Sequence, residues 1–242
     1  MPTVNKWMAD AMEKLFSNQF HPVRVTHTEM LDSQLKCVRF QGDLSGTNYA
    51  VGHVIEFRVG DRDFRHYTPA LYDEEQGICE VLFYLHGLGP GSDWVEQLKV
   101  GTTTNLMGPG GKMVLVAEQT QHVLFGDESS LGLVRGLFKA TELNGSHCEA
   151  VLELDETHQH WPKQLEMNAT VVEKSAQAPA VGMLNWLEQL SSEQWQAFQL
   201  ATFYLTGRAQ SIQGIKKTLK ARGIANKQIQ TMPYWADNKR GL

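Results

Sequence analysis

The chain has 242 residues, long enough for one large domain or two small ones, each with a sizeable core. Its 42% apolar and 20% charged residues are ordinary for a globular protein, and a net charge of −5 gives it no reason to bind nucleic acid or an anionic membrane. The sequence contains neither a signal-peptide-like N-terminal run nor an apolar stretch of membrane-spanning length, so we expect a cytoplasmic protein. Three scattered cysteines, Cys37, Cys79 and Cys148, argue against a disulfide framework, a zinc site or an iron–sulfur cluster. Any redox chemistry therefore requires a bound organic cofactor.

The charge is unevenly distributed along the chain. Residues 207–242 hold eight basic side chains and one acid, Asp237, whereas the remainder is strongly acidic. A solvated helix face with a basic tail is the common explanation of such a run. The alternative is a positive field that attracts an anionic substrate or cofactor. Composition alone favours the first explanation.

The first part of the chain has the pattern of a small antiparallel structure. Residues 4–20 carry apolar side chains at helical spacing, which predicts an amphipathic helix. Short β-branched or aromatic segments separated by Gly, Asp and Asn then predict strands at 23–28, 35–40, 53–59 and 81–86. Short strands at this spacing are typical of an antiparallel barrel or sandwich.

The second part alternates between strands and helices. An apolar run at 112–118 precedes a loop at 126–130 and a helix through Phe138. The pattern then predicts strands at 147–154, 169–172 and 198–205, and helices at 181–190 and 209–222, the last ended by Gly223. This alternation indicates a parallel sheet covered by helices, with the join between the two parts near residues 108–111.

Two segments of the first part carry candidate chemistry. Residues 65–68 (Arg-His-Tyr-Thr) place an arginine fork, an aromatic ring and a hydroxyl close together, which suits a flavin dinucleotide. Residues 86–94 follow an apolar strand and are rich in glycine, with Ser92 or Asp93 as a helix N-cap for a helix through Lys99. The N–H groups of that helix start would form an anion site. By itself each segment is weak evidence for a cofactor site. The first pattern is short enough to occur by chance in unrelated chains, and the second is also typical of an ordinary strand-to-helix turn.

Two further segments lie in the second part. Residues 126–130 (Gly-Asp-Glu-Ser-Ser) are a small-residue loop where a nicotinamide ribose or diphosphate could lie, although they match neither the G-x-G-x-x-G fingerprint nor a Walker P-loop. Tyr234 and Trp235 are adjacent aromatics near the chain end, which could pack on a flat cofactor or at a domain interface.

Taken together and in this order, these segments resemble the siderophore-interacting protein family, a branch of the ferredoxin–NADP reductase superfamily, over nearly the whole chain from about residue 20. Residues 65–68 match the family's R-x-Y-T flavin motif, and residues 86–94 match its H-G…G-P-x-x-x-W segment. Gly101 and residues 108–109 match the G…G-P that closes the barrel domain. Residues 126–131 resemble the G-D-E-T-A-L nucleotide loop, and residues 234–235 the terminal Y-W.

The sequence departs from the family pattern at two points. Ala70 stands where the family often has an arginine, and Gly207-Arg208 replaces a G-E pair, which reverses a charge near the expected nucleotide cleft. Lys174 lies where a base could contact a 2′-phosphate or the adenosine. These features do not choose between NADH and NADPH.

The resemblance implies a Greek-key antiparallel FAD-binding β-barrel with an N-terminal helix over residues 1–108. It implies a parallel-sheet α/β NAD(P)H-binding domain with a basic C-terminal tail over residues 109–242. The implied catalytic residues at the flavin are Tyr67, Thr68 and His86. The implied cofactor-binding residues are Arg65, Tyr67, Thr68, His86, Gly87, Gly89, Gly91, Ser92, Trp94, Gly126, Asp127, Glu128, Ser129, Tyr234 and Trp235. Lys239, Arg240 and Arg208 would attract an anionic ferric chelate.

The function implied is an FAD-dependent ferric-siderophore reductase that uses NADH or NADPH, acts as a monomer, binds no metal of its own and has a ferredoxin as an alternative electron donor. Two other functions stay open. A general NAD(P)H–flavin or ferredoxin reductase would share every flavin residue but would have no saturable preference for ferric chelates. A non-enzymatic ferric-chelate binding protein would bind no flavin.

Overall fold

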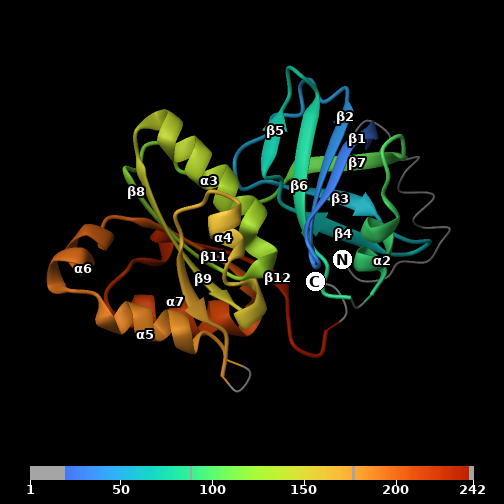
Figure 1. The fold of residues 1–242 in the computed structure, drawn as a ribbon. Coiled ribbons are helices and arrows are strands. Elements are labelled where there is room, and N and C mark those ends of the chain that lie inside the picture. Colours follow the sequence, from blue (N-terminus) through green and yellow to red (C-terminus); the bar gives the residue numbers. More distant parts are fainter. Residues whose placement is uncertain (1–19, 88, 176–177, 240–242) are drawn as a thin grey trace. The chain divides into compact units, whose positions relative to one another are not determined.

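The computed structural model describes residues 20–87, 89–175 and 178–239. The chain divides into two compact units, and the division falls between Val114 and Leu115. Each unit has its own sheet (Figure 1). The amphipathic helix expected over residues 4–20 lies outside the described residues, except for Phe20, which begins the first strand.

The described part of the first unit is an antiparallel sheet with the helix α2, and the antiparallel sheet is as the sequence predicted. Its seven strands pair in the order β4-β3-β7-β1-β2-β6-β5. The strands are β1 (Phe20–Asp32), β2 (Leu35–Gly42), β3 (Val54–Arg58), β4 (Phe64–Tyr67), β5 (Leu71–Asp73), β6 (Ile78–Tyr84) and β7 (Thr103–Gly110), and the helix is α2 (Pro90–Gln97).

The sheet curls around an aromatic core. Strands β3 and β2 are three places apart in the sheet order, a spacing of about 14 Å in a flat sheet. Yet the ring centroids of Phe57 on β3 and Phe40 on β2 are only 4.8 Å apart, and both rings are fully buried. Tyr67 on β4 likewise meets Phe83 on β6 with ring centroids 4.7 Å apart. The inner faces of distant strands therefore share one core, as in a barrel.

The second unit is a parallel sheet with helices on both faces, again as predicted. Its five strands run in the order β10-β9-β8-β11-β12, and every pair is parallel. The strands are β8 (Gln121–Gly126), β9 (His147–Leu154), β10 (Thr170–Glu173), β11 (Thr202–Arg208) and β12 (Ile229–Trp235). The helices are α3 (Leu131–Asn144), α4 (Trp161–Gln164), α5 (Val181–Gln189), α6 (Ser192–Phe198) and α7 (Ala209–Ala221), with short 3-10 turns at Glu128–Ser130, Glu156–His158 and Asn226–Gln228.

Helices cover this sheet as the handedness of parallel connections requires. Helix α3 connects β8 to β9 on one face, whereas α5 and α7 pack on the other (Figure 1). The apolar side chains of α7 that fall at helical spacing, Ile212, Ile215 and Leu219, join the core on that second face. The connections leave the carboxyl ends of all five strands at one edge of the sheet.

Several element boundaries differ from the sequence prediction. Of residues 108–111, near which we expected the join, residues 108–110 lie inside β7, because the peptide groups up to Gly110 still pair with β3. The apolar run 112–118 forms no strand, and the strand before the loop at 126–130 is β8. Residues 192–198 form a helix, so β11 starts at Thr202 rather than at Phe198. Ser191 caps the start of this helix, because its hydroxyl accepts a hydrogen bond from the Gln194 N–H.

Candidate functional site

In the first unit the end of β4 meets the start of α2. A Cβ atom at Gly91 would lie 3.1 Å from the Tyr67 hydroxyl and 3.5 Å from Cγ of Arg65. Arg65 and Tyr67 are two residues apart on one strand and therefore point to the same side. The structure thus brings together two motifs that are more than twenty residues apart, and Gly91 allows the close approach.

Helix α2 begins at Pro90, which corrects the expected N-cap of Ser92 or Asp93. Proline has the backbone angle of a first helical residue, so the helix starts two residues earlier than the hydroxyl and carboxyl side chains suggested. The N-cap is Gly89, with φ of 95°, and it supplies no side-chain cap. Pro90 has no N–H and the Asp93 N–H donates to the Gly89 carbonyl at 3.3 Å, so the N–H groups of Gly91 and Ser92 are the ones that an anion at this end of the helix would meet.

The other end of α2 is fastened by a buried lysine. The Lys36 ammonium donates hydrogen bonds to the carbonyl oxygens of Val95, Glu96 and Leu98 at 2.8, 3.3 and 3.0 Å. A cation at this position complements the helix dipole and satisfies carbonyls that have no helical partner. Trp94 packs on Phe57, with ring centroids 5.1 Å apart. Trp94, which the resemblance assigned to the cofactor, therefore anchors α2 to the barrel core.

A buried hydroxyl without a partner lies in the first turn of α2. Ser92 is 4% exposed, and its oxygen accepts or donates no hydrogen bond within the described chain. An unpaired buried hydroxyl costs roughly 1–3 kcal/mol. The Ser92 hydroxyl is therefore an unused hydrogen-bonding group in the turn where an anion would bind. Together with the uncapped helix end and Arg65, Ser92 fits a diphosphate.

The remaining predicted residues of this site differ in exposure and charge. Burial raises the pKa of Tyr67 far above its ordinary value, so its hydroxyl stays protonated at any physiological pH. Partial desolvation, and secondarily the charge of Arg65, lowers the pKa of His86, so the neutral imidazole predominates at pH 7. Thr68 is buried at the end of β4. Gly87 and Gly89 both adopt positive φ angles, which only glycine takes without strain.

In the second unit the strand order predicts where a ligand would bind. Chain connections run outward from β8 to β9 and β10 on one side, and from β11 to β12 on the other. Open parallel sheets bind ligands outside the carboxyl ends of the strands at such a point of reversal. Here that point lies between Gly126 at the end of β8 and Gly207 near the end of β11. The loop that the sequence analysis selected, residues 126–130, begins at this point.

Asp127 holds the carboxyl ends of three strands together. One carboxylate oxygen accepts hydrogen bonds from the backbone N–H of Arg208 at 2.9 Å and from the indole Nε1 of Trp235 at 2.8 Å. The other accepts from the Ser129 N–H at 3.0 Å and from the Ser129 hydroxyl. Burial raises the pKa of Asp127, while the Ser129 hydrogen bonds oppose that shift. Asp127 therefore fastens β8, β11 and β12 together where a ligand would enter.

Glu128 lies in a buried charge cluster rather than on the open side of the loop. Its carboxylate accepts hydrogen bonds from the Asp155 N–H at 2.9 Å and the Lys174 ammonium at 2.9 Å, and lies 3.1 Å from Nδ1 of His158. Ligand atoms of Glu128, Asp155 and His158 lie within 4.8 Å of one another, but Lys174 already supplies a cation there, 3.3 Å from Asp155 Oδ2. Burial opposes the charge on Lys174, yet the Glu128 carboxylate holds the pKa of Lys174 well above its usual range.

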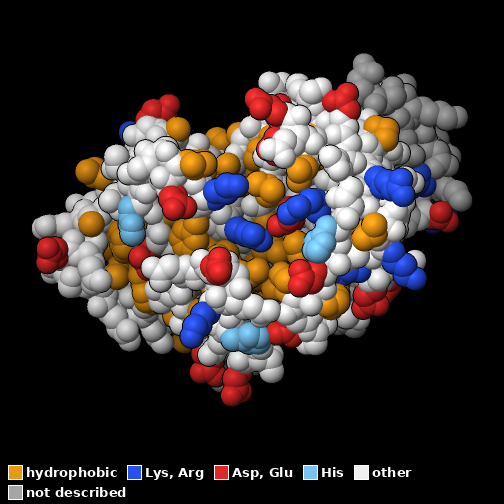
Figure 2. Space-filling model, turned by 45° about the horizontal axis from the view of Figure 1, so that its top comes forward, with side chains coloured by type: hydrophobic (Ala, Val, Ile, Leu, Met, Phe, Trp, Pro, Cys, Tyr) orange, Lys and Arg blue, Asp and Glu red, His pale blue; other side chains and the backbone are white. Residues whose placement is uncertain are grey.

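The basic residues expected to attract a chelate are differently placed. Arg208 makes a bidentate ion pair with Asp237, at 3.0 and 2.5 Å, and lies over the Trp235 ring, 5.6 Å from its centroid. Lys239 is exposed, and Arg240 lies outside the described residues. On the face in Figure 2, Lys and Arg side chains are interspersed with Asp and Glu. The basic segment therefore includes at least one cation that is already neutralised.

Sequence reasoning missed Lys36, Asp155 and His158, which hold or surround the two sites. Lys36 and His158 act through contacts that no local pattern shows. Asp155 did have a signal, because it directly follows the second parallel strand, β9.

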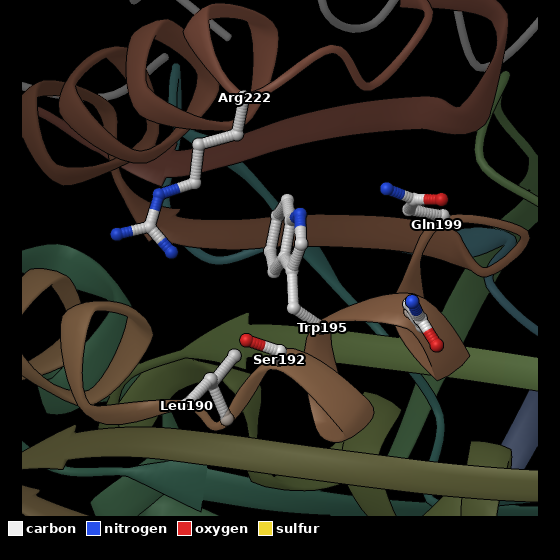
Figure 3. A pocket seen from close by; sticks show the side chains of 6 residues that line it. Leu190, Ser192, Trp195, Gln199 and Arg222 are labelled. Carbon is white, nitrogen blue, oxygen red and sulfur yellow. The ribbon is translucent and has the colours of Figure 1, made fainter.

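A separate surface pocket lies away from both sites. It has a volume of about 430 Å³ and is lined by Leu190, Ser192, Trp195, Gln196, Gln199 and Arg222 (Figure 3). The Arg222 guanidinium lies 5.1 Å from the Trp195 ring centroid and donates to the Leu187 carbonyl at 2.7 Å. Helix α6 leads into the start of β11, and Arg222 follows α7 before the start of β12, so this pocket is at the amino edge of the sheet. None of the predicted site residues lines it.

Among the described helices, none is long and apolar enough to cross a membrane.

Comparison with known proteins places these features in context. Residues 119–238 match the model of the siderophore-interacting protein family, and residues 58–113 match that of the siderophore-interacting FAD-binding domain. The second match confirms the predicted FAD-binding domain. The chain is 28% identical over 182 residues to the ferric vibriobactin reductase ViuB of two Vibrio cholerae serotype O1 strains. That match covers 73% of this chain and 65%, just under two thirds, of the relative.

Solved structures share the fold. The siderophore-interacting protein of Acinetobacter baumannii has a TM-score of 0.72 at 15% identity, covering 91% of this chain and 92% of the other. A siderophore utilization protein from T. fusca has a TM-score of 0.73 at 20% identity, covering 92% and 95%. The ferredoxin reductase of carbazole 1,9a-dioxygenase has a TM-score of 0.74 at 16% identity, covering 89% and 69%. These likenesses confirm the predicted fold class of an antiparallel barrel followed by a parallel α/β domain.

Proposed function

The chain belongs to the siderophore-interacting protein family, and from that membership and the two sites we propose that it is an FAD-dependent ferric-siderophore reductase supplied with electrons by a nicotinamide nucleotide. The observation that carries the proposal is the uncapped start of α2 beside Arg65 and Tyr67, with the unpaired Ser92 hydroxyl in its first turn. A binding protein without a flavin has no need of this arrangement.

The first unit would bind FAD. When bound, FAD accepts two electrons as hydride and can release them singly, as Fe(III) requires. Arg65 would neutralise the diphosphate, and the N–H groups at the start of α2 would donate hydrogen bonds to its oxygens. Tyr67 would offer a neutral ring, and Thr68 a hydroxyl, to the isoalloxazine. His86, which is neutral at pH 7, would contact the flavin without adding charge.

The second unit would bind NADH or NADPH at the carboxyl edge of the sheet around Asp127, with the diphosphate near residues 126–130. The overall reaction balances when one hydride from the nucleotide reduces two ferric chelates: NAD(P)H and two Fe(III) give NAD(P)⁺, a proton and two Fe(II). Siderophores hold Fe(III) through hard oxygen donors, and the less charged Fe(II) is bound more weakly, so reduction releases the iron. Lys239 and Arg240 would attract anionic chelates; a ferredoxin remains an alternative electron donor.

One observation favours a second candidate, a general NAD(P)H–flavin reductase. Arg208, one of the three cations expected to attract the chelate, is paired with Asp237. An enzyme that does not bind ferric chelates would keep the flavin site and lose nothing by this pairing.

An anaerobic spectroscopic titration tests the proposal. The purified protein is loaded with FAD, reduced with NADH or NADPH, and mixed with a ferric siderophore and a colour-forming Fe(II) chelator. We expect the flavin absorption near ~450 nm to bleach with nucleotide and to return as Fe(II) appears, with saturation in the chelate. A flavin that bleaches but does not transfer electrons to ferric chelates would reject the siderophore reductase and support the second candidate, a general flavin reductase. A protein that takes up no FAD would reject both.

A further inference from the structure

Asp155 lies where a parallel dinucleotide-binding sheet places its ribose contact. It is the first residue after β9, the strand that follows β8 and α3 in the chain and neighbours β8 in the sheet. In such sheets the adenosine ribose lies over the end of this second strand, and an acidic residue there accepts hydrogen bonds from the ribose hydroxyls. The sequence analysis had not named Asp155 as a candidate site residue.

The structure joins Asp155 directly to the proposed diphosphate loop. The Asp155 N–H donates a hydrogen bond to Glu128 Oε1 at 2.9 Å, so the end of β9 is fastened to residues 126–130. Its own side chain points away from the core: it is 48% exposed, whereas Glu128 is 1% exposed. A ligand with its diphosphate at the loop can therefore reach the Asp155 carboxylate, but not that of Glu128.

The charges around Asp155 favour a neutral group over an anion. Glu128 and Asp155 share one ammonium, that of Lys174, whose Nζ lies 2.9 Å from Glu128 Oε2 and 3.3 Å from Asp155 Oδ2. Two carboxylates against one ammonium leave these three groups with a net charge of −1. The fourth group, His158, has its Nδ1 3.1 Å from Glu128 Oε1 and 3.9 Å from Asp155 Oδ2, and it leaves that charge in place while its imidazole is neutral. Lys174, the base that could have contacted a 2′-phosphate, is already held between two acids. A ribose 2′-hydroxyl can donate to Asp155, whereas a 2′-phosphate would be repelled.

We propose that Asp155 is the residue that selects NADH over NADPH, by accepting a hydrogen bond from the adenosine 2′-hydroxyl and by repelling a 2′-phosphate. This inference rests on the proposed function, because it assumes that the second unit binds a nicotinamide nucleotide. It adds the identity of the co-substrate and a specificity-determining residue.

Binding measurements on the full chain test the inference without turnover. The dissociation constants of NAD⁺ and NADP⁺ are measured by calorimetry for the unmodified protein, for Asp155→Asn and for Glu156→Gln. Asparagine keeps the size of residue 155 and can still accept from Lys174, and Glu156 is an exposed neighbouring acid that makes a matched control. The same three proteins are then compared by kcat/KM for flavin reduction with NADH and NADPH.

We expect the unmodified protein to bind NAD⁺ roughly 10- to 100-fold more tightly than NADP⁺, the value of a hydrogen bond to a charged group. Asp155→Asn should shrink that ratio about tenfold, by weaker NAD⁺ binding and stronger NADP⁺ binding, and Glu156→Gln should leave it unchanged. NADP⁺ binding as tight as NAD⁺ binding, or a ratio that Asp155→Asn does not move, would overturn the inference while leaving the reductase proposal in place. Failure of both nucleotides to bind would overturn the inference together with the nucleotide half of the proposed function.

Discussion

The indole N–H of Trp235 donates a 2.8 Å hydrogen bond to the buried Asp127 carboxylate, and thereby joins the last residue of β12 to the first residue after β8. Cations flank the indole: Lys174 Nζ and the Arg208 guanidinium each lie 5.6 Å from the ring centroid. Such contacts contribute roughly 0.5–2 kcal/mol each. Trp235 is thus tied to the carboxyl edge of the second unit's own sheet.

Replacing Trp235 by phenylalanine tests this relationship. The ring would keep its stacking surface but lose the donor, so Asp127 would lose one of its hydrogen bonds. We expect a loss of about 1–2 kcal/mol in the free energy of unfolding and several-fold weaker nucleotide binding, measured by urea denaturation and by calorimetry. Trp195→Phe, at the pocket on the opposite sheet edge, is the control and should leave nucleotide binding unchanged. Equal effects of the two variants on nucleotide binding would contradict the prediction.

Arg65→Ala should weaken FAD binding. Arg65 is the cation beside Gly91 at the start of α2, and its loss removes a charge-assisted contact to the diphosphate. We expect the FAD dissociation constant to rise about 10- to 100-fold, with little change in thermal stability of the apoprotein. Fluorescence titration of released FAD measures the constant. Arg62→Ala removes an exposed arginine three residues away and should leave FAD binding intact; if it weakens binding equally, the effect is one of net charge.

Gly207→Ala should disrupt the carboxyl edge of the second sheet around Asp127. Gly207 has φ of 90°, and a Cβ atom there would overlap the Asp127 carboxylate. We expect a loss of at least about 1–3 kcal/mol of stability, with impaired nucleotide binding in whatever folds. Gly214→Ala, within α7 and with no atom near its would-be Cβ, should instead raise stability by about 0.5–1 kcal/mol. Chemical denaturation of both variants decides the matter; a neutral Gly207→Ala would show that the loop can move aside.

The buried Glu128–Lys174 pair should make stability depend on pH. Burial opposes ionisation of Glu128, but Lys174 outweighs it and lowers the pKa of Glu128 below its usual 4.5. The unfolded chain then binds more protons than the folded chain at acid pH, so this stability is present above about pH 4.5 and is lost as the pH falls through the folded pKa. The pKa of Lys174 is raised in the folded chain, so the contribution of Lys174 to stability is present below pH 10.5 and is lost as the pH rises through the pKa of the folded state.

Lys174→Met tests that account. Removing Lys174 takes away the ammonium partner of the buried Glu128 carboxylate, and breaking a buried ion pair in this way costs up to about 3–5 kcal/mol near neutral pH. The hydrogen bond from the Asp155 N–H and the contact with His158 remain and reduce that cost. Without Lys174, burial raises the pKa of Glu128, so the variant should lose less stability than the unmodified protein on acidification. Urea midpoints between about pH 3 and pH 7 measure this, with the exposed Lys217→Met as control. Parallel acid curves for Lys174→Met and the unmodified protein would contradict the prediction.

Much of the fold could be read from local patterns. The change from short strands to strand–helix alternation predicted the two kinds of sheet, and the spacing of Ile212, Ile215 and Leu219 predicted α7. Boundaries were less accurate where tertiary pairing overrides the local signal. Strand β7 includes a proline and three glycines at or just beyond its end, which read as a linker, but its pairing with β3 and β1 makes it a strand.

By itself, the sequence predicted which segments carry chemistry, because glycines, hydroxyls and aromatics next to strand ends have the same local preferences in any context. It also determined the two-part architecture, since hydrophobic period is a local property. Only the tertiary structure decided what each charged side chain faces. Asp127 and Trp235 are 108 residues apart, and Glu128 and Lys174 are 46 apart, yet strand order brings both pairs into contact. A cation or carboxylate in a sequence is available to a ligand only if the folded sheet has not already provided its partner, and that depends on which strands are neighbours.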